Sequence, residues 1–483
     1  MGKYTLTARR IGLTAVVTPL ITLSNLILLP ILTKNLAIAD YGAYALILVT
    51  IGLLPMLVTL GLSQAMTRFL AAATDKREIR EVFYSTVFIV LLASLIVSAL
   101  LFLFVPQIAA SWFQNNTTVA LLLVPNVFIA CVTAHVMAYF VTFQQIKRYS
   151  VLNLFNAWLN TALIAYFVLS GRGLEGAVIA LLIQQLVVFA VIVYLVVAEI
   201  GFAIPTFKHA RQYLAYGLPL IPGNLSSWIV NTSDRFLIAF FLGAAAVGYY
   251  SPGYNLGGML SMVAAPLVTL LPPVLSKHYD DDHITDVRTI LTYSLKYYAG
   301  IALPCVFALS VLSKPLLLVL TTQQIAANGY LVTPFVAAGS ALLGASAVLV
   351  TIIALKKKTA VIGTIWILCA VLNFGFNLVL IPYLGLVGAA LTTFLAMLLA
   401  FLLTMYYSLR EFKFDVNRGF IVKSACGSSI MALFLLVWNP SGPLSILSSI
   451  TLAAVIYLTI LLLLRGFTIR ELKLIYGIYR GSY

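Results

Sequence analysis

The chain is dominated by long apolar runs of about 20 residues each, separated by short connections. As helices, runs of this length match the hydrocarbon thickness of a bilayer, because each helical residue adds about 1.5 Å. In lipid, only helices and closed barrels satisfy all of their own backbone hydrogen bonds. The runs lack the strict alternation of apolar and polar residues that barrel strands need. The pattern therefore predicts an all-α integral membrane protein.

About fourteen spanning helices can be placed along the chain, with ends set to within several residues. The expected spans are 11–33, 43–67, 82–105, 118–141, 151–169, 175–198, 213–242, 248–272, 291–312, 330–354, 359–381, 386–408, 419–437 and 444–464. The connections between them are too short for a sizeable soluble domain.

The charged residues predict how the chain lies in the membrane. The net charge of +15 could indicate a nucleic-acid partner, but the basic residues lie in short connections, so we expect no nucleic acid. If the N-terminus is inside, only Lys34, Arg172, Arg235 and Lys314 of the 29 Lys and Arg fall on the outer side. This bias predicts a cell (cytoplasmic or inner) membrane protein with both termini in the cytoplasm. It also favours the count of fourteen helices, because a wrong number would place the basic connections on both sides of the membrane.

Two short motifs repeat along the chain. Residues 36–44 resemble 242–250 at an offset of 206, and residues 173–177 resemble 385–389 at an offset of 212. An offset of six helices predicts a parallel repeat about an axis along the membrane normal. The expected parts are an N-terminal six-helix lobe (1–205), a C-terminal six-helix lobe (206–415), and two extra helices with a cytoplasmic tail (416–483).

Prolines mark expected helix bends. Pro19 lies in the first expected span, and Pro219 and Pro222 lie in the seventh, which is its equivalent in the repeat. Pro55 and Pro266 are expected to interrupt the second and eighth spans. Interrupted helices at matching positions point to a transport pathway, although proline is also common in membrane helices generally.

Two basic residues interrupt apolar segments. Arg68 lies toward the inner end of the second span and Arg235 in the outer part of the seventh. A charge inside the bilayer costs about 3 kcal/mol or more unless it is paired or faces water. These residues could line a hydrated cleft and bind the phosphate of an anionic headgroup, or form structural ion pairs. Asp234 is adjacent to Arg235, but helix neighbours point about 100° apart, so a pair between them is not assured.

Several amide side chains could support such a site. Asn224 and Asn231 lie in the seventh span, and Asn156 and Asn160 share one face of the fifth. Amides can bind sugar hydroxyl groups, and they can equally join helices through hydrogen bonds. Both interpretations stay open for these four residues.

No enzyme signature is present in the sequence. There is no phosphate-binding loop of the Walker type and no nucleophile beside a base, so we expect neither catalytic residues nor cofactors. The four cysteines lie far apart in apolar runs, and the stretch from His278 to His283 is expected to be a solvated loop, so no metal site is expected. Any driving force must come from a proton or sodium gradient, the membrane potential, or consumption of the product.

Five motifs together resemble a known family. They are LILLPILT at 26–33, YGAY at 41–44, TRF at 67–69, DRFLI at 234–238 and LGAAAVGYYS at 242–251. In these motifs the chain resembles the polysaccharide-biosynthesis flippases (O-antigen or repeat-unit type) of the multidrug/oligosaccharidyl-lipid/polysaccharide exporter superfamily. The resemblance implies two lobes around a central cavity that work by alternating access.

The resemblance also implies a function. The expected substrate is a polyprenyl-pyrophosphate-linked oligosaccharide, moved across the cytoplasmic membrane for surface polysaccharide or glycan assembly. The expected partners are this lipid-linked oligosaccharide, membrane lipids, a polysaccharide polymerase and glycosyltransferases. The alternatives are a cation-coupled multidrug exporter of the same superfamily, which needs buried carboxylates, and a scaffold that transports nothing.

Overall fold

The computed structural model describes residues 2–71, 73 and 75–467, and for residues 2–16 only the course of the backbone. Every element in this part of the chain is a helix, so the predicted all-α class is confirmed. The elements are α1 (Gly2–Asn35), α2 (Ile38–Val58), α3 (Leu62–Leu70), α4 (Lys76–Leu103), α5 (Val105–Trp112), α6 (Thr117–Thr142), α7 (Ile146–Leu169), α8 (Gly173–Ile200), α9 (Ala210–Gly217), η1 (Leu218–Leu220), α10 (Ile221–Thr232), α11 (Asp234–Leu242), α12 (Ala244–Gly258), α13 (Ser261–Asp280), α14 (Ile284–Leu320), α15 (Gln323–Gly329), α16 (Val332–Leu355), α17 (Thr359–Glu411), α18 (Arg418–Trp438) and α19 (Pro443–Leu463). The expected cytoplasmic tail beyond residue 467 lies outside the described residues.

Ten helical segments of the described chain are long and apolar enough to cross a membrane, or eleven if the bent pair α12 and α13 is one span. Two of the ten, Ile146–Ile200 and Thr359–Glu411, have 55 and 53 residues, more than twice the length that a span needs. The first contains the junction of α7 and α8, and the second contains the non-helical Gly385. The count of fourteen spans stays a prediction.

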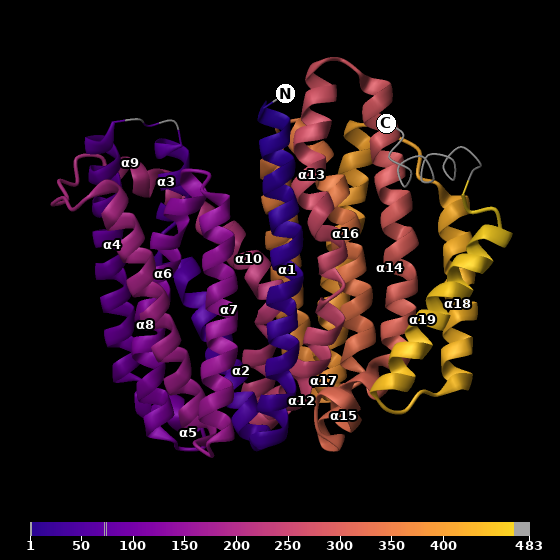
Figure 1. The fold of residues 1–483 in the computed structure, drawn as a ribbon, viewed down its shortest axis with the longest axis horizontal. Coiled ribbons are helices and arrows are strands. Elements are labelled where there is room, and N and C mark those ends of the chain that lie inside the picture. Colours follow the sequence, from indigo (N-terminus) through magenta and orange to yellow (C-terminus); the bar gives the residue numbers. More distant parts are fainter. Residues whose placement is uncertain (1, 72, 74, 468–483) are drawn as a thin grey trace. The chain divides into compact units, whose positions relative to one another are not determined.

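The helices gather into two compact units, Met1–Ser251 and Pro252–Tyr483. In the first unit α6 packs against α4 and α8, and α7 packs against α8 and α1 (Figure 1). In the second unit α14 packs against α16 and α18, and α19 packs against α18 (Figure 1). The expected lobes at 1–205 and 206–415, and the separate part at 416–483, stay predictions.

The second expected span, 43–67, is wrong as one continuous helix. α2 ends at Val58, and α3 begins at Leu62 after a turn in which Gly61 has a φ of +69°. A Cβ on Gly61 would overlap the carbonyl oxygen of Gly217 at the end of α9 and lie 2.5 Å from its carbonyl carbon. The backbones of Gly61 and Gly217 thus approach closely at the break between α2 and α3. Pro55, which was expected to interrupt this span, lies inside α2. Arg68 therefore lies on the short helix α3, which is separate from the spanning helix α2.

The seventh and eighth expected spans, 213–242 and 248–272, are also interrupted. The first divides into α9, η1, α10 and α11. The second divides into α12 and α13, which meet at a bend of 46°. Pro266 lies inside α13, so the interruption is not at this proline. Each broken helix frees backbone groups that need new partners inside a membrane.

The repeated motif brings its two copies into direct contact. Gly42 in α2 faces the start of α12, where a Cβ on residue 42 would overlap the carbonyl oxygen of Ala244 and lie 2.9 Å from the nitrogen of Gly248. A Cβ on Gly248 would in turn overlap the carbonyl oxygen of Ile38. Positions 38 and 42 correspond to 244 and 248 at the offset of 206, so the contact is reciprocal. The repeat of whole lobes stays a prediction that this contact supports.

Buried amides join the two parts of α17 across Gly385. Asn377 donates to Asn373 Oδ1 at 3.2 Å, and Thr392 donates to Asn377 Oδ1. These three side chains have no exposed surface. The bond between Thr392 and Asn377 therefore links the helical segments on either side of the kink at Gly385.

We expect Gly385→Ala to destabilise the protein by about 1–3 kcal/mol, through backbone strain alone. The residue has φ 59° and ψ −136°, a region that only glycine occupies readily, yet open space surrounds the position of a Cβ. Gly375→Ala is the matched control, since residue 375 lies in the same helix with equal space and no positive φ. Thermal unfolding in detergent compares the two variants, and equal midpoints would argue against strain at residue 385.

Candidate functional site

The candidate site is the charged pair at the start of α11. α10 ends at Thr232, and α11 begins at Asp234 after a break at Ser233. Oδ1 of Asp234 accepts the backbone N–H of Arg235 at 2.9 Å. A carboxylate is favoured at this end of a helix, because the first backbone N–H groups have no helical acceptor. Both α10 and α11 pack against α2.

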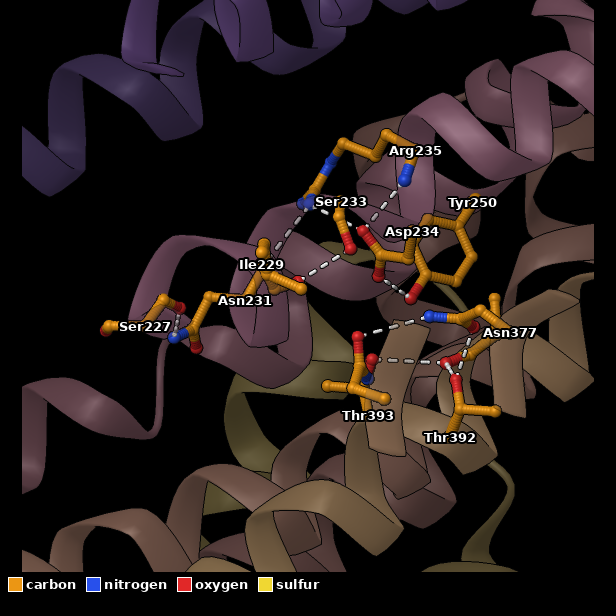
Figure 2. Close-up of polar contacts among 12 residues, drawn as sticks. Ser227, Ile229, Asn231, Ser233, Asp234, Arg235, Tyr250, Asn377, Thr392 and Thr393 are labelled. Atoms are coloured by element: carbon orange, nitrogen blue, oxygen red, sulfur yellow. Dashed lines mark hydrogen bonds and ion pairs between the residues drawn. The ribbon is translucent and has the colours of Figure 1, made fainter. Parts of the chain in front are cut away.

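Asp234 and Arg235 form a buried ion pair (Figure 2). Only 1% of Asp234 and 7% of Arg235 is exposed, and Nη1 of Arg235 lies 3.3 Å from Oδ1 of Asp234. The same nitrogen donates to the carbonyl oxygen of Asn231 at 3.3 Å. Tyr250 donates its hydroxyl hydrogen to the other carboxylate oxygen, and its ring lies 5.9 Å from the guanidinium carbon. The adjacent residues thus do pair, because the long arginine side chain reaches back to a carboxylate held at the helix start.

Arg68 lies apart from this pair. It is an exposed residue in the last turn of α3, a helix that packs against α6 and α9. Within the described residues it forms no ion pair, and no contact joins it to Arg235. The described residues therefore show no direct contact between the two arginines that were expected to share a cleft. Their role in binding phosphate stays a prediction.

The four supporting amides have different surroundings. Asn231 donates to the carbonyl oxygen of Ser227 at 2.7 Å, within its own helix (Figure 2), and Asn224 is half-buried. Asn156 accepts a hydrogen bond from Gln184, which joins α7 to α8. Oδ1 of Asn160 is buried and has no hydrogen-bond partner among the described residues. Asn156 is thus engaged between helices, whereas Asn160 keeps an unused acceptor.

The three prolines of the expected bends lie in two kinds of helix. Pro19 lies inside α1, which continues through it. Pro219 lies in the 3-10 turn η1, and Pro222 lies in the first turn of α10. These two coincide with an interruption of the helix, as a residue without a backbone N–H allows. Whether the interruption serves transport stays a prediction.

Two buried polar partners are not predicted by the sequence. Tyr250 belongs to a repeated motif, but nothing in its spacing from Asp234 predicts their hydrogen bond. His135 bridges Ser63 and Thr86, each at 3.0 Å, and so joins α3, α6 and α4. Both networks link residues that are far apart in the sequence, so only the packed structure reveals them.

Three side chains at the turn between α13 and α14 lie within reach of one metal ion. Their ligand atoms, from His278, His283 and Asp286, lie within 4.8 Å of one another. Oδ2 of Asp286 is 3.8 Å from Nδ1 of His278 and 3.9 Å from Nδ1 of His283. The contacts of the Asp286 carboxylate with the two imidazole rings account for this arrangement. His283 and Asp286 are exposed. The expected absence of a metal stays a prediction.

Comparisons with known sequences identify relatives. A family model described as polysaccharide biosynthesis protein matches residues 8–278, more than half of the 483 residues. Two relatives from Haloferax volcanii are a probable flippase AglR, 26% identical over 212 residues, and a probable low-salt glycan biosynthesis flippase Agl15, 21% identical over 218 residues. The matches cover 43% and 44% of this chain and 44% and 46% of those proteins, so they span less than half of each relative.

Comparisons with solved structures extend the likeness of fold. The lipid II flippase MurJ in an inward closed conformation matches with a TM-score of 0.76 over 95% of this chain and 99% of that one, at 17% identity. An inward-facing multidrug resistance MATE family transporter of the MOP superfamily matches with a TM-score of 0.65 over 81% of this chain and 94% of that one, at 16% identity. At such identities the likeness shows the fold alone. Together with its apolar helices, it makes this a multi-pass membrane protein. The match of the family model over residues 8–278 confirms the resemblance, and the chain belongs to the polysaccharide biosynthesis protein family.

Proposed function

We propose that this protein is a flippase for a polyprenyl-pyrophosphate-linked oligosaccharide, which it moves across the cytoplasmic membrane by alternating access. The observation that carries the proposal is the family match over residues 8–278. The names of the two Haloferax volcanii relatives and the fold shared with a lipid II flippase support it. Both termini are proposed to be cytoplasmic, and the protein is proposed to act without catalysis or a cofactor.

In this proposal Arg68 and Arg235 have different roles. Arg68 is exposed and without an ion-pair partner in the described chain, so its guanidinium is available to a pyrophosphate. Arg235 is held by Asp234 and is proposed to act from within the broken segment of α10 and α11, next to Asn231. The polymerase and glycosyltransferase partners are proposed because they would consume and supply such a lipid-linked substrate. An ion gradient, the membrane potential or consumption of the product would drive transport.

A cation-coupled multidrug exporter is the second candidate, and the shared fold with a MATE family transporter favours it. That function needs a buried carboxylate that can bind a cation. Asp234 is buried, but it already accepts hydrogen bonds from the backbone of Arg235, its guanidinium and the hydroxyl of Tyr250. A carboxylate engaged by three donors is a poor cation ligand, so the flippase remains the stronger proposal.

We expect Arg68→Gln to slow flipping of a fluorescent polyprenyl-pyrophosphate oligosaccharide in proteoliposomes by about tenfold to hundredfold. One lost hydrogen bond to a charged group is worth about 1.5–3 kcal/mol. Arg77→Gln is the matched control, because it removes an exposed arginine at the start of α4. Arg68 gives a cleaner test than Arg235, since its exposed side chain contributes little to folding.

Other results would redirect the proposal. If the wild type flips no lipid but extrudes cationic dyes on a sodium or proton gradient, the multidrug exporter would replace the flippase. If it does neither, the scaffold remains. Flipping that Arg68→Gln and Arg77→Gln leave equally fast would contradict the proposed role of Arg68 while leaving the flippase intact.

A further inference from the structure

A basic cavity lies within the second compact unit, between the first turns of α14 and the segment 412–417 that joins α17 to α18. Its volume is about 600 Å³. The residues that the argument uses are Arg288, Thr292, Lys296, Lys413, Asp415 and Asn417. From the sequence, these basic residues are expected only to lie on the cytoplasmic side of the membrane.

The charges of the cavity favour an anion. The described residues that line it include three cations, Arg288, Lys296 and Lys413, and one carboxylate, that of Asp415. Arg288 and Lys413 are exposed, and within the described residues neither forms an ion pair with a carboxylate. Within the described chain these two side chains are therefore open to an anion such as a phosphate, and a dielectric constant below that of water strengthens the attraction.

The protein holds this cavity in a defined geometry. The hydroxyl of Thr292 donates to the carbonyl oxygen of Asp415 at 2.9 Å, which ties the linking segment to α14. Oδ1 of Asn417 accepts the backbone N–H of Phe420 at 2.9 Å and so begins α18. The guanidinium carbon of Arg288 lies 5.8 Å from the ring centroid of Phe412 in the same segment. Both walls of the cavity are therefore fixed to each other before any ligand binds.

Lys296 is a buried residue in the wall of the cavity. Only 5% of the residue is exposed, and its Nζ lies 5.0 Å from the ring of Phe420 and 5.8 Å from that of Tyr293. Aromatic faces offset part of the cost of removing an ammonium group from water.

An apolar track leads away from the cavity along α14. Tyr293 lines the cavity, and Tyr297 and Ile301 follow at four-residue spacing, so the three share one helix face. They are 40%, 38% and 53% exposed, and the rings of Tyr293 and Tyr297 stack with centroids 5.8 Å apart. Exposed tyrosines followed by an aliphatic side chain are typical of the passage from the membrane interface to the hydrocarbon.

We propose that this cavity binds the phosphate group of a membrane lipid, whose acyl or prenyl chain lies along Tyr293, Tyr297 and Ile301. Arginine and lysine with the amide of Asn417 nearby suit a phosphate ester, and the guanidinium can bind two of its oxygens at once. A soluble phosphate would bind to the charged side chains but would make no contact with Tyr293, Tyr297 and Ile301. The proposal does not depend on which substrate the protein transports.

The test is lipid binding by the full-length protein in detergent, measured by native mass spectrometry. The probes are phosphatidylglycerol, phosphatidylcholine, a polyprenyl phosphate and inorganic phosphate. We expect phosphatidylglycerol to bind more tightly than phosphatidylcholine, and Arg288→Gln/Lys413→Gln to weaken that binding by about tenfold to thirtyfold, from the loss of two cations. Lys147→Gln/Lys208→Gln, which removes two exposed lysines from the first unit, is expected to change it less than twofold.

The other possible results either contradict or support the proposed lipid-phosphate site. Equal weakening by the cavity and control variants, or equal affinity for the two phospholipids, would overturn the site. Displacement of phosphatidylglycerol by inorganic phosphate at similar concentration would overturn the lipid as ligand. Tighter binding of the polyprenyl phosphate, with the same dependence on Arg288 and Lys413, would support the site and identify the carrier lipid as its source. Arg288→Lys/Lys413→Arg keeps both charges and should bind as the wild type does, which excludes misfolding as the cause.

Discussion

Asp234→Ala is expected to destabilise the protein by about 3–5 kcal/mol, because Arg235 would keep its charge in a buried place without a counter-ion. The pair has less than a tenth of its surface exposed, and Tyr250 would lose its acceptor at the same time. Thermal or denaturant unfolding of the purified protein in detergent measures the loss. A change below 1 kcal/mol would show that the carboxylate does not stabilise the arginine.

The double variant Asp234→Ala/Arg235→Met is the matched control for this loss. Removing both charges leaves no unpaired ion, so the double variant should recover most of the stability that Asp234→Ala loses. Its transport then separates folding from function. If the double variant is stable and flips lipid at the normal rate, Arg235 serves the structure alone; if it is stable and inactive, the charge acts on the substrate.

Gly42→Ala is expected to cost about 3 kcal/mol or more, since the added methyl group would overlap the backbone of α12. The atoms it would meet belong to Ala244 and Gly248 and cannot rotate away as a side chain could. Gly248→Ala, the equivalent change in the second copy of the motif, should have a similar effect. Because both changes force α2 and α12 apart, their combination should cost less than the two losses added together.

Gly52→Ala is the control on the same helix. No atom lies within 4 Å of the position of its Cβ, so alanine should be neutral or stabilise α2 by up to about 1 kcal/mol through helix propensity. The same unfolding measurement compares all three single variants. If Gly42→Ala were as stable as Gly52→Ala, the close approach of α2 and α12 would not contribute to the fold.

The amino-acid sequence determined the class of this protein through its apolar composition. Segments such as 118–141 and 330–354 were placed within a few residues of α6 and α16, because a helix in lipid must be apolar over its whole length. The motif at 234–238 likewise singled out Asp234 and Arg235, since a charge inside an apolar run is costly and must be paired or serve a function.

The tertiary structure decided where long helices break and which polar groups meet. The interruption at Gly61 depends on the backbone of Gly217, 156 residues later, and no local propensity records that approach. Tyr250 completes the bonds of Asp234 from 16 residues away, and Thr292 ties Asp415 into the basic cavity across 123 residues. Hydropathy is a sum over neighbours in sequence, whereas a hydrogen bond or a backbone contact depends on neighbours in space.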